Sequence, residues 1–224
     1  MLQERSHHLE RAAARPAFAG TTPSRVLVVD QHPIIGVGIA ALLGKGSDVV
    51  VETTTDPDAA VRAMANGSTD LVISEIAFSG LSRGLDLLSV PRPRPPVVLL
   101  TGLSHPSLLR AALDRGAEGV ASKAAPVAEI LAAIRTVAGG AASIDPGVLD
   151  LARRARRRPA PRELAIVAEV ASGATNAVVA ERLGIRRPTV EAVLRRLFDR
   201  YAVTSRIALV RIAEHEGWLL GLAA

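Results

Sequence analysis

Residues 173–199 read GATNAVVAERLGIRRPTVEAVLRRLFD. Gly173 and Gly184 are typical helix stops, and Pro188 is typical of the first turn of a helix. After Pro188, apolar residues recur at the spacing that places them on one helix face, namely Val190, Val193, Leu194, Leu197 and Phe198. The segment therefore predicts two helices joined by a short turn, the second with a buried apolar face and an exposed basic face.

The flanking sequence extends this pattern into a small all-α domain at residues 161–220. Four helices are expected there: Pro161–Ser172, Asn176–Leu183, Pro188–Asp199 and Ser205–His215. Ahead of them lies a basic, proline-containing stretch that ends in RRARRRPAP, residues 153–161. Proline and a charge run are typical of connecting segments. Residues 141–160 therefore predict an interdomain linker.

Residues 25–140 alternate short aliphatic runs with segments of helical pattern. The runs are Val26–Val29, Val49–Val51, Leu71–Ile73, Val97–Leu100 and Gly119–Ala121, and the helical segments are Ile34–Leu43, Pro57–Asn66, Gly84–Leu88, Ser107–Arg115 and Pro126–Val137. Strands that are apolar throughout indicate a parallel sheet covered on both faces. The alternation predicts an α/β domain with a doubly wound, five-stranded parallel sheet. Residues 1–24 show no sustained period and predict a flexible extension.

Composition excludes several classes of protein. With 224 residues, 49% of them hydrophobic and 22% charged, the chain is long enough for two small globular domains or one large one. No apolar run approaches the roughly 18–20 residues that span a bilayer, so a membrane protein is not expected. The chain has no cysteine, and its N-terminus does not resemble a secretory signal, so we expect a cytoplasmic protein.

Charge is distributed unevenly along the chain. Between Arg153 and Arg211 there are 14 arginines and five acids, whereas acids outnumber basic residues in the rest of the sequence. A basic C-terminal domain beside an acidic N-terminal domain is the asymmetry expected when one domain binds nucleic acid.

Four polar residues follow or end strands of the predicted sheet. Asp30 follows the first strand and Lys123 follows the fifth, while Glu75 ends the third and Thr101 ends the fourth. The carboxyl ends of the strands in a doubly wound sheet meet at one site, so we expect these side chains to lie together. They do not make a complete acid/base or nucleophile set, and an enzyme is not expected.

The order of these residues, with Asp30-Gln-His-Pro33 after strand one and Gly119-Val-Ala-Ser-Lys123 at strand five, resembles the receiver domain of bacterial two-component response regulators. The resemblance implies a flavodoxin-like fold. It also implies a site in which two acids hold magnesium, an aspartate accepts a phosphoryl group, and threonine and lysine bind the phosphate. Here Gln31 replaces the second acid, Glu75 replaces the phosphoacceptor aspartate, and Val120 stands where the family has an aromatic residue.

These departures predict an atypical receiver with a degenerate phosphoacceptor pocket of Asp30, Gln31, Glu75, Thr101 and Lys123. No cofactor is expected, and Asp30 and Glu75 would bind magnesium only weakly. A carboxylate displaced by one methylene is poorly placed for phosphoryl transfer, which depends on position at the ångström scale. We therefore predict a standing ion pair between Glu75 and Lys123 in place of aspartate phosphorylation, with little support for a cognate histidine kinase. Whether the pocket binds a small-molecule ligand stays open.

The C-terminal motifs Ala180-Glu-Arg-Leu-Gly-Ile185, Arg186-Arg-Pro-Thr-Val190 and Thr204-Ser-Arg206 resemble the LuxR/NarL-type helix-turn-helix domain. The resemblance implies that Pro188–Asp199 is a recognition helix for the DNA major groove. Arg195 and Arg196 are the expected base-reading residues. The remaining expected DNA contacts are Asn176, Arg186, Arg187 and Thr189 at phosphates, and Glu191 and Ala192 on the exposed helix face.

Glu191 and Val193 depart from that family, which carries lysine and histidine at these positions. A carboxylate near the groove repels phosphate, although it can also accept a hydrogen bond from the amino group of cytosine. We predict a bacterial, homodimeric, DNA-binding transcriptional regulator that works independently of phosphorylation, with Ser205–His215 as the dimer contact. Two alternatives stay open: a conventional phosphorylation-driven regulator, and an antagonist that binds related regulators and has lost DNA specificity.

Overall fold

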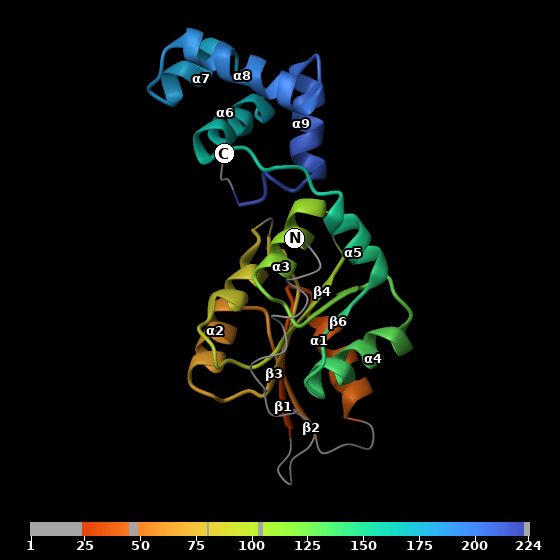
Figure 1. The fold of residues 1–224 in the computed structure, drawn as a ribbon. Helices are drawn as coiled ribbons and strands as arrows, with labels where there is room; N and C mark the ends of the chain where they lie inside the picture. The colour runs from red at the N-terminus through yellow and green to blue at the C-terminus, as the bar shows by residue number, and fades with distance from the viewer. Residues whose placement is uncertain (1–23, 45–48, 80, 103–104, 222–224) are drawn as a thin grey trace. The chain divides into compact units, whose positions relative to one another are not determined.

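The computed structural model describes residues 24–44, 49–79, 81–102 and 105–221, so the extension expected at 1–24 lies, apart from Ser24, outside the described residues. The chain divides into two compact units (Figure 1). The first takes in the residues up to Asp150 except His105–Arg110, and the second takes in His105–Arg110 and the residues from Leu151 onward. Each is described by itself.

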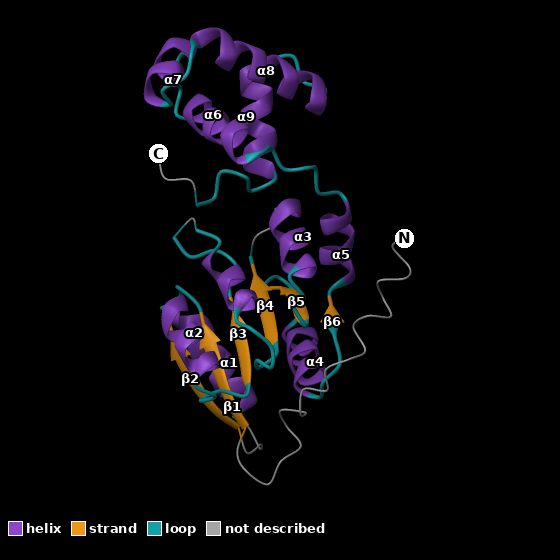
Figure 2. Ribbon diagram, turned by 60° about the vertical axis from the view of Figure 1, so that its left-hand side comes forward, coloured by secondary structure: helices purple, strands orange, loops and turns teal. Residues whose placement is uncertain are grey.

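The N-terminal unit is built around a parallel sheet with strand order β2-β1-β3-β4-β5-β6. The strands are β1 (Ser24–Val29), β2 (Val49–Thr54), β3 (Leu71–Ser74), β4 (Val97–Thr101), β5 (Gly119–Ser122) and β6 (Ser143–Ile144). The helices in this part of the sequence are α1 (Pro33–Leu43), α2 (Pro57–Ala65), the 3₁₀ helix η2 (Arg83–Ser89), α3 (Pro106–Asp114), α4 (Val127–Ala138) and α5 (Pro146–Arg153), and the division between the two units falls within α3 and α5. The predicted doubly wound α/β fold is confirmed (Figure 2).

An aliphatic core joins the central strands to α1 and α4. Ile39 of α1 and Ile134 of α4 pack against Val28, Ile73 and Leu100 of three neighbouring strands. These strands are buried on both faces, which is why their sequences are apolar throughout rather than alternating.

The expected count of five strands is one too low, because β6 adds a sixth. The main-chain N–H groups of Ser143 and Asp145 donate to the carbonyl oxygens of Glu118 and Val120, both at 2.9 Å, and extend the sheet beyond β5. The segment expected as a linker, 141–160, therefore holds this strand and α5. Asp145 starts α5 because its side chain accepts hydrogen bonds from the N–H groups of Gly147 and Val148.

The C-terminal unit contains the four expected helices, α6 (Pro161–Ala171), α7 (Asn176–Arg182), α8 (Arg187–Tyr201) and α9 (Arg206–His215). The predicted apolar face of α8 supplies the centre of their core, with Val190 and Leu197 fully buried. Gly173 and Gly184 follow α6 and α7 with φ angles of 87° and 63°. This left-handed conformation ends a helix and favours glycine, as the sequence predicts.

Candidate functional site

The strand-end residues come together at one edge of the N-terminal sheet. Asp30, Glu75 and Thr101 are buried, with 4%, 6% and 1% of their surface exposed. The Nζ of Lys123 lies 2.5 Å from Asp30 Oδ2 and 2.7 Å from Glu75 Oε2. The expected contact between Glu75 and Lys123 is therefore present, and Asp30 shares the same ammonium group.

Backbone groups hold the remaining oxygens of the two carboxylates. Asp30 Oδ1 accepts a hydrogen bond from the N–H of His32 at 2.8 Å, and Glu75 Oε1 accepts one from the N–H of Ile76 at 2.6 Å. The N–H of Lys123 donates to the carbonyl oxygen of Thr101 at 2.9 Å, which positions the base of the lysine side chain. The geometry of the three charged groups is thus set by strand ends and by the turns that follow them.

The charges of this cluster favour a protonated lysine. Burial by itself would lower the pKa of Lys123, but hydrogen bonds from its ammonium to Asp30 and Glu75, together with the charges of those carboxylates, raise the pKa above its ordinary value. Two carboxylates against one ammonium give the cluster a formal charge of about −1.

Magnesium, which the receiver resemblance implies, does not fit these residues well. The ion requires several oxygen ligands in near-octahedral geometry. The amide oxygen of Gln31 accepts a hydrogen bond from the N–H of Ser79 at 2.8 Å, in the loop after β3, and the ammonium of Lys123 already contacts both carboxylates. Among the residues that the structure describes, no group of three or more histidine, aspartate or glutamate side chains could hold a metal ion.

A small hollow of about 300 Å³ adjoins this cluster on the side of β2. Asp30 and Pro33 line it together with Thr53, Thr54 and Thr55. The three threonines were not among the expected site residues, because polar residues at the end of an exposed edge strand follow no recognisable motif.

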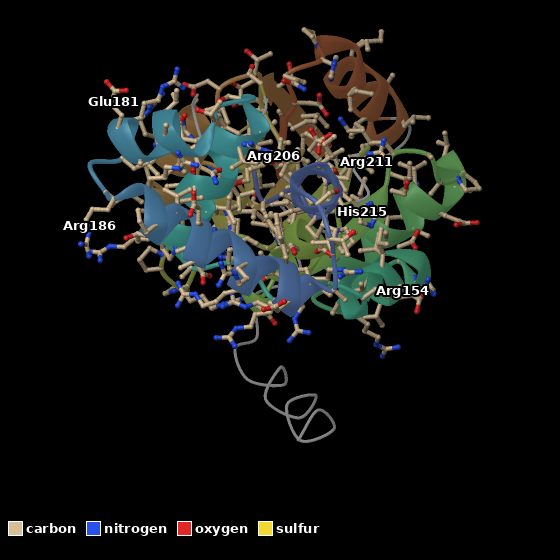
Figure 3. All side chains as sticks on the ribbon, turned by 90° about the horizontal axis from the view of Figure 1, so that it is seen from above. Arg154, Glu181, Arg186, Arg206, Arg211 and His215 are labelled. Carbon is tan, nitrogen blue, oxygen red and sulfur yellow. The ribbon has the colours of Figure 1, made fainter. Side chains whose placement is uncertain are left out.

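The second candidate site is the exposed face of α8. Ala192, Arg195 and Arg196 are exposed, whereas Val190 and Val193 on the opposite face are buried. Arg186, Arg187 and Thr189 are exposed at the start of the helix, and Figure 3 shows Arg186 extending away from the ribbon. These exposed residues, all expected to contact DNA, are therefore accessible to a ligand.

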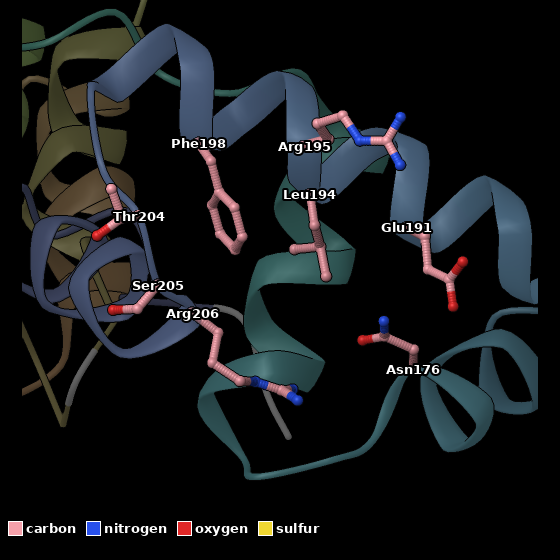
Figure 4. Close-up of a pocket in the computed structure, with 8 residues that line it drawn as sticks. All are labelled: Asn176, Glu191, Leu194, Arg195, Phe198, Thr204, Ser205 and Arg206. Carbon is pink, nitrogen blue, oxygen red and sulfur yellow. The ribbon is translucent and has the colours of Figure 1, made fainter.

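A groove of about 380 Å³ runs between the starts of α7 and α9 and the middle of α8 (Figure 4). It is lined by Asn176, Glu191, Leu194, Arg195, Phe198, Thr204, Ser205 and Arg206. Asn176, Glu191 and Arg195 were expected at the DNA interface, and the groove brings them together.

The residues at the start of α9 were not expected in this site. The guanidinium of Arg206 donates from Nη2 to the carbonyl oxygen of Ala174 at 2.5 Å and so joins α9 to the turn before α7. The motif Thr204-Ser-Arg206 was visible in the sequence, but nothing in it indicates which groove it lines. Arg196 does not line this groove. Hydrogen bonds from Arg200 lower the pKa of Glu163 at the start of α6, and the charge of Arg196 adds to that effect.

No helix within the described part of the chain is long and apolar enough to cross a membrane.

Comparisons with known proteins identify a family for each of the two parts of the chain. Residues 26–135 match the family model of the response regulator receiver domain, and residues 160–213 match that of the bacterial regulatory proteins of the luxR family. The chain is 32% identical over 217 residues to the transcriptional activator protein ExaE of Pseudomonas putida, an alignment that covers 89% of this chain and 99% of ExaE. It is 31% identical over 201 residues to the nitrate/nitrite response regulator NarP of Escherichia coli K12, covering 84% and 93%.

A solved structure shares the fold. RcsB from Salmonella enterica serovar Typhimurium, bound to a promoter, aligns with a TM-score of 0.61 and 22% identity over 87% of this chain and 99% of that one. The sheet order, the helical C-terminal unit and the two family matches lead to one conclusion. The chain belongs to the NarL/LuxR family of response regulators, DNA-binding transcriptional regulators that join a receiver domain to a LuxR-type helix-turn-helix domain.

Proposed function

We propose that this response regulator recognises specific duplex DNA through α8, and that its receiver domain holds its working conformation without phosphorylation. The observation that carries the proposal is the contact of Lys123 Nζ with both Asp30 and Glu75. A phosphoryl group on a third-strand acid would bring negative charge to this lysine. Glu75 brings a permanent negative charge to the same ammonium.

The surroundings of Glu75 oppose its use as a phosphoacceptor. Phosphoryl transfer requires a carboxylate oxygen held in line with the donor and a cation that neutralises the developing charge. Oε1 of Glu75 accepts from the N–H of Ile76, Oε2 contacts Lys123, and only 7% of the side chain is exposed. Gln31 adds no negative charge for a magnesium ion. The receiver therefore has no need of a histidine kinase.

Recognition of DNA is assigned to the basic face of the C-terminal unit. Arginine can donate two hydrogen bonds to the major-groove edge of guanine, and Arg195 lies exposed beside the groove at the middle of α8. We assign Asn176, Arg186, Arg187 and Thr189 to phosphate contacts, which position a domain without reading bases. Arg196 is assigned to the flank of the interface.

Dimerisation is assigned to α9. Ile207 on this helix is 66% exposed, and a large apolar side chain gains free energy when a partner covers it. A dimer with two-fold symmetry would bind paired half-sites in the DNA.

The test is incubation of the full-length protein with a small-molecule phosphodonor and magnesium, followed by intact-mass measurement. The wild type is expected to gain no acid-labile phosphate. The matched control is the double variant Gln31→Asp with Glu75→Asp, which restores both acids of the receiver pattern and is expected to gain one phosphate. Stoichiometric phosphate on Glu75 of the wild type would overturn the proposal.

A further inference from the structure

Glu191 interrupts the basic face of α8 between Arg187 and Arg195, and Asp199 is a second exposed acid near the end of the helix. Glu191 lies one helical turn before Arg195, and both line the groove at the start of α7 (Figure 4). The Glu191 side chain is 41% exposed, so its carboxylate is accessible to a ligand bound on this face. Ala192 beside it is exposed and small, which lets another molecule approach the helix closely.

Arg187 compensates the charge of this acid. Its Nε donates to Oε1 of Glu191 at 2.9 Å, an ion pair between residues four apart on the same helix face. The guanidinium has five N–H donors, this contact uses one, and 66% of the Arg187 side chain is exposed. The pair can therefore approach DNA with no net charge while Arg187 still offers donors to a phosphate.

The chemistry of the carboxylate selects among bases. Glu191 can only accept hydrogen bonds when ionised. In the major groove guanine presents acceptors at O6 and N7, thymine presents the acceptor O4, and adenine presents its amino donor beside the acceptor N7. Cytosine presents the N4 amino donor without a neighbouring acceptor, so it is the base that a carboxylate meets without repulsion.

We propose that Glu191 is a specificity-determining residue that selects cytosine at one position of each DNA half-site, and that Arg187 is its positioning residue. This inference rests on the proposed function, because it requires α8 to enter the major groove. It gives Glu191, whose negative charge would otherwise only weaken DNA binding, a specific partner in the cytosine base.

The experiment selects and sequences random duplexes bound by the full-length protein and by three variants at one fixed salt concentration. The wild type is expected to enrich a motif with an invariant cytosine. Glu191→Gln is expected to exchange that cytosine for adenine and leave other positions unchanged, because glutamine pairs with N6 and N7 of adenine. Glu191→Ala should accept any base there. The matched control, Glu181→Gln, changes an exposed acid on α7 and should reproduce the wild-type motif.

Binding constants then test both roles. Replacing the selected cytosine is expected to weaken wild-type binding on the order of tenfold and Glu191→Ala binding by less than about twofold. Arg187→Met should weaken binding to every duplex, and this loss should be smaller in the Glu191→Gln background, where no unpaired carboxylate remains. An equal loss of binding affinity in both backgrounds would contradict the proposed positioning role of Arg187.

The outcomes separate this inference from the proposed function. A wild-type motif that Glu191→Gln and Glu191→Ala both reproduce at every position overturns the role of Glu191 and leaves the proposed function standing. Failure of the wild type to enrich any motif overturns both.

Discussion

Replacement of Lys123 by methionine tests the standing ion cluster of the receiver domain. Methionine keeps a long apolar side chain but removes the ammonium that contacts Asp30 and Glu75. Their side chains are only 4% and 7% exposed, so two carboxylates would be left buried without a cation. Removal of one partner from a buried ion pair costs about 3–5 kcal/mol. Because Lys123 is itself 16% exposed, we expect a loss near the lower end, about 3 kcal/mol in the free energy of unfolding.

A second substitution isolates the electrostatic part of that loss. Glu75→Gln retains an oxygen that can accept from the N–H of Ile76 and leaves Lys123 paired with Asp30, so it should cost only about 1 kcal/mol. In the Glu75→Gln background one carboxylate of the pair is gone. The Lys123→Met substitution should then cost less by about 1–2 kcal/mol, the coupling typical of residues in one ion-pair network.

The assay must follow the receiver domain separately, because the chain has one tryptophan and one tyrosine, Trp218 and Tyr201, both in the C-terminal unit. Amide hydrogen exchange of peptides from β1, β3 and β5 in increasing urea reports the free energy of unfolding of the sheet. Equal costs of Lys123→Met in both backgrounds, or a cost below about 1 kcal/mol in the wild type, would refute the standing ion cluster.

Three further predictions concern single residues. In an NMR titration, the pKa of the Lys123 ammonium should lie above the ordinary lysine value of about 10.4. Its contribution to stability is therefore complete below pH about 10.4 and is lost as the pH rises through the folded-state pKa. Glu163→Gln should lower the stability of the C-terminal unit by about 1–2 kcal/mol, measured by Trp218 fluorescence during unfolding. Hydrogen bonds from Arg200 lower the pKa of Glu163, so the contribution of its carboxylate to stability is present above pH about 4.3 and is lost as the pH falls further. Arg195→Ala should weaken DNA binding by about 1–3 kcal/mol and relax the base preference at one position, measured by titrations with single-base variants of the site, whereas Arg135→Ala on the receiver should change neither.

The helices, the strands and the strand-end cluster could be predicted from sequence because apolar spacing and the geometry of parallel strands determine them. Continuous apolar runs such as Val26–Val29 indicate strands buried on both faces. Parallel strands place their carboxyl ends at one edge, which is enough to bring Asp30, Glu75 and Lys123 together without knowledge of any contact. The buried face of α8 follows from apolar spacing alone.

Other features depend on pairings that no local pattern records. Strand β6 has two residues, Ser143 and Ile144, and exists because its backbone pairs with β5. The amide of Gln31 is hydrogen bonded to Ser79, which is 48 residues away and has a positive φ angle of 49°. Arg206 reaches the turn before α7 through tertiary packing. The composition of a segment or the type of a residue does not indicate such partners.

Selection and sequencing of duplexes bound by the full-length protein, with and without a phosphodonor at one near-physiological salt concentration, tests the central claim most directly. Salt must be held constant because DNA affinity depends steeply on it. The standing ion cluster predicts the same motif of paired half-sites, bound with the same affinity, in both samples. A motif that is enriched only after treatment with the phosphodonor would contradict the claim that this receiver works without phosphorylation.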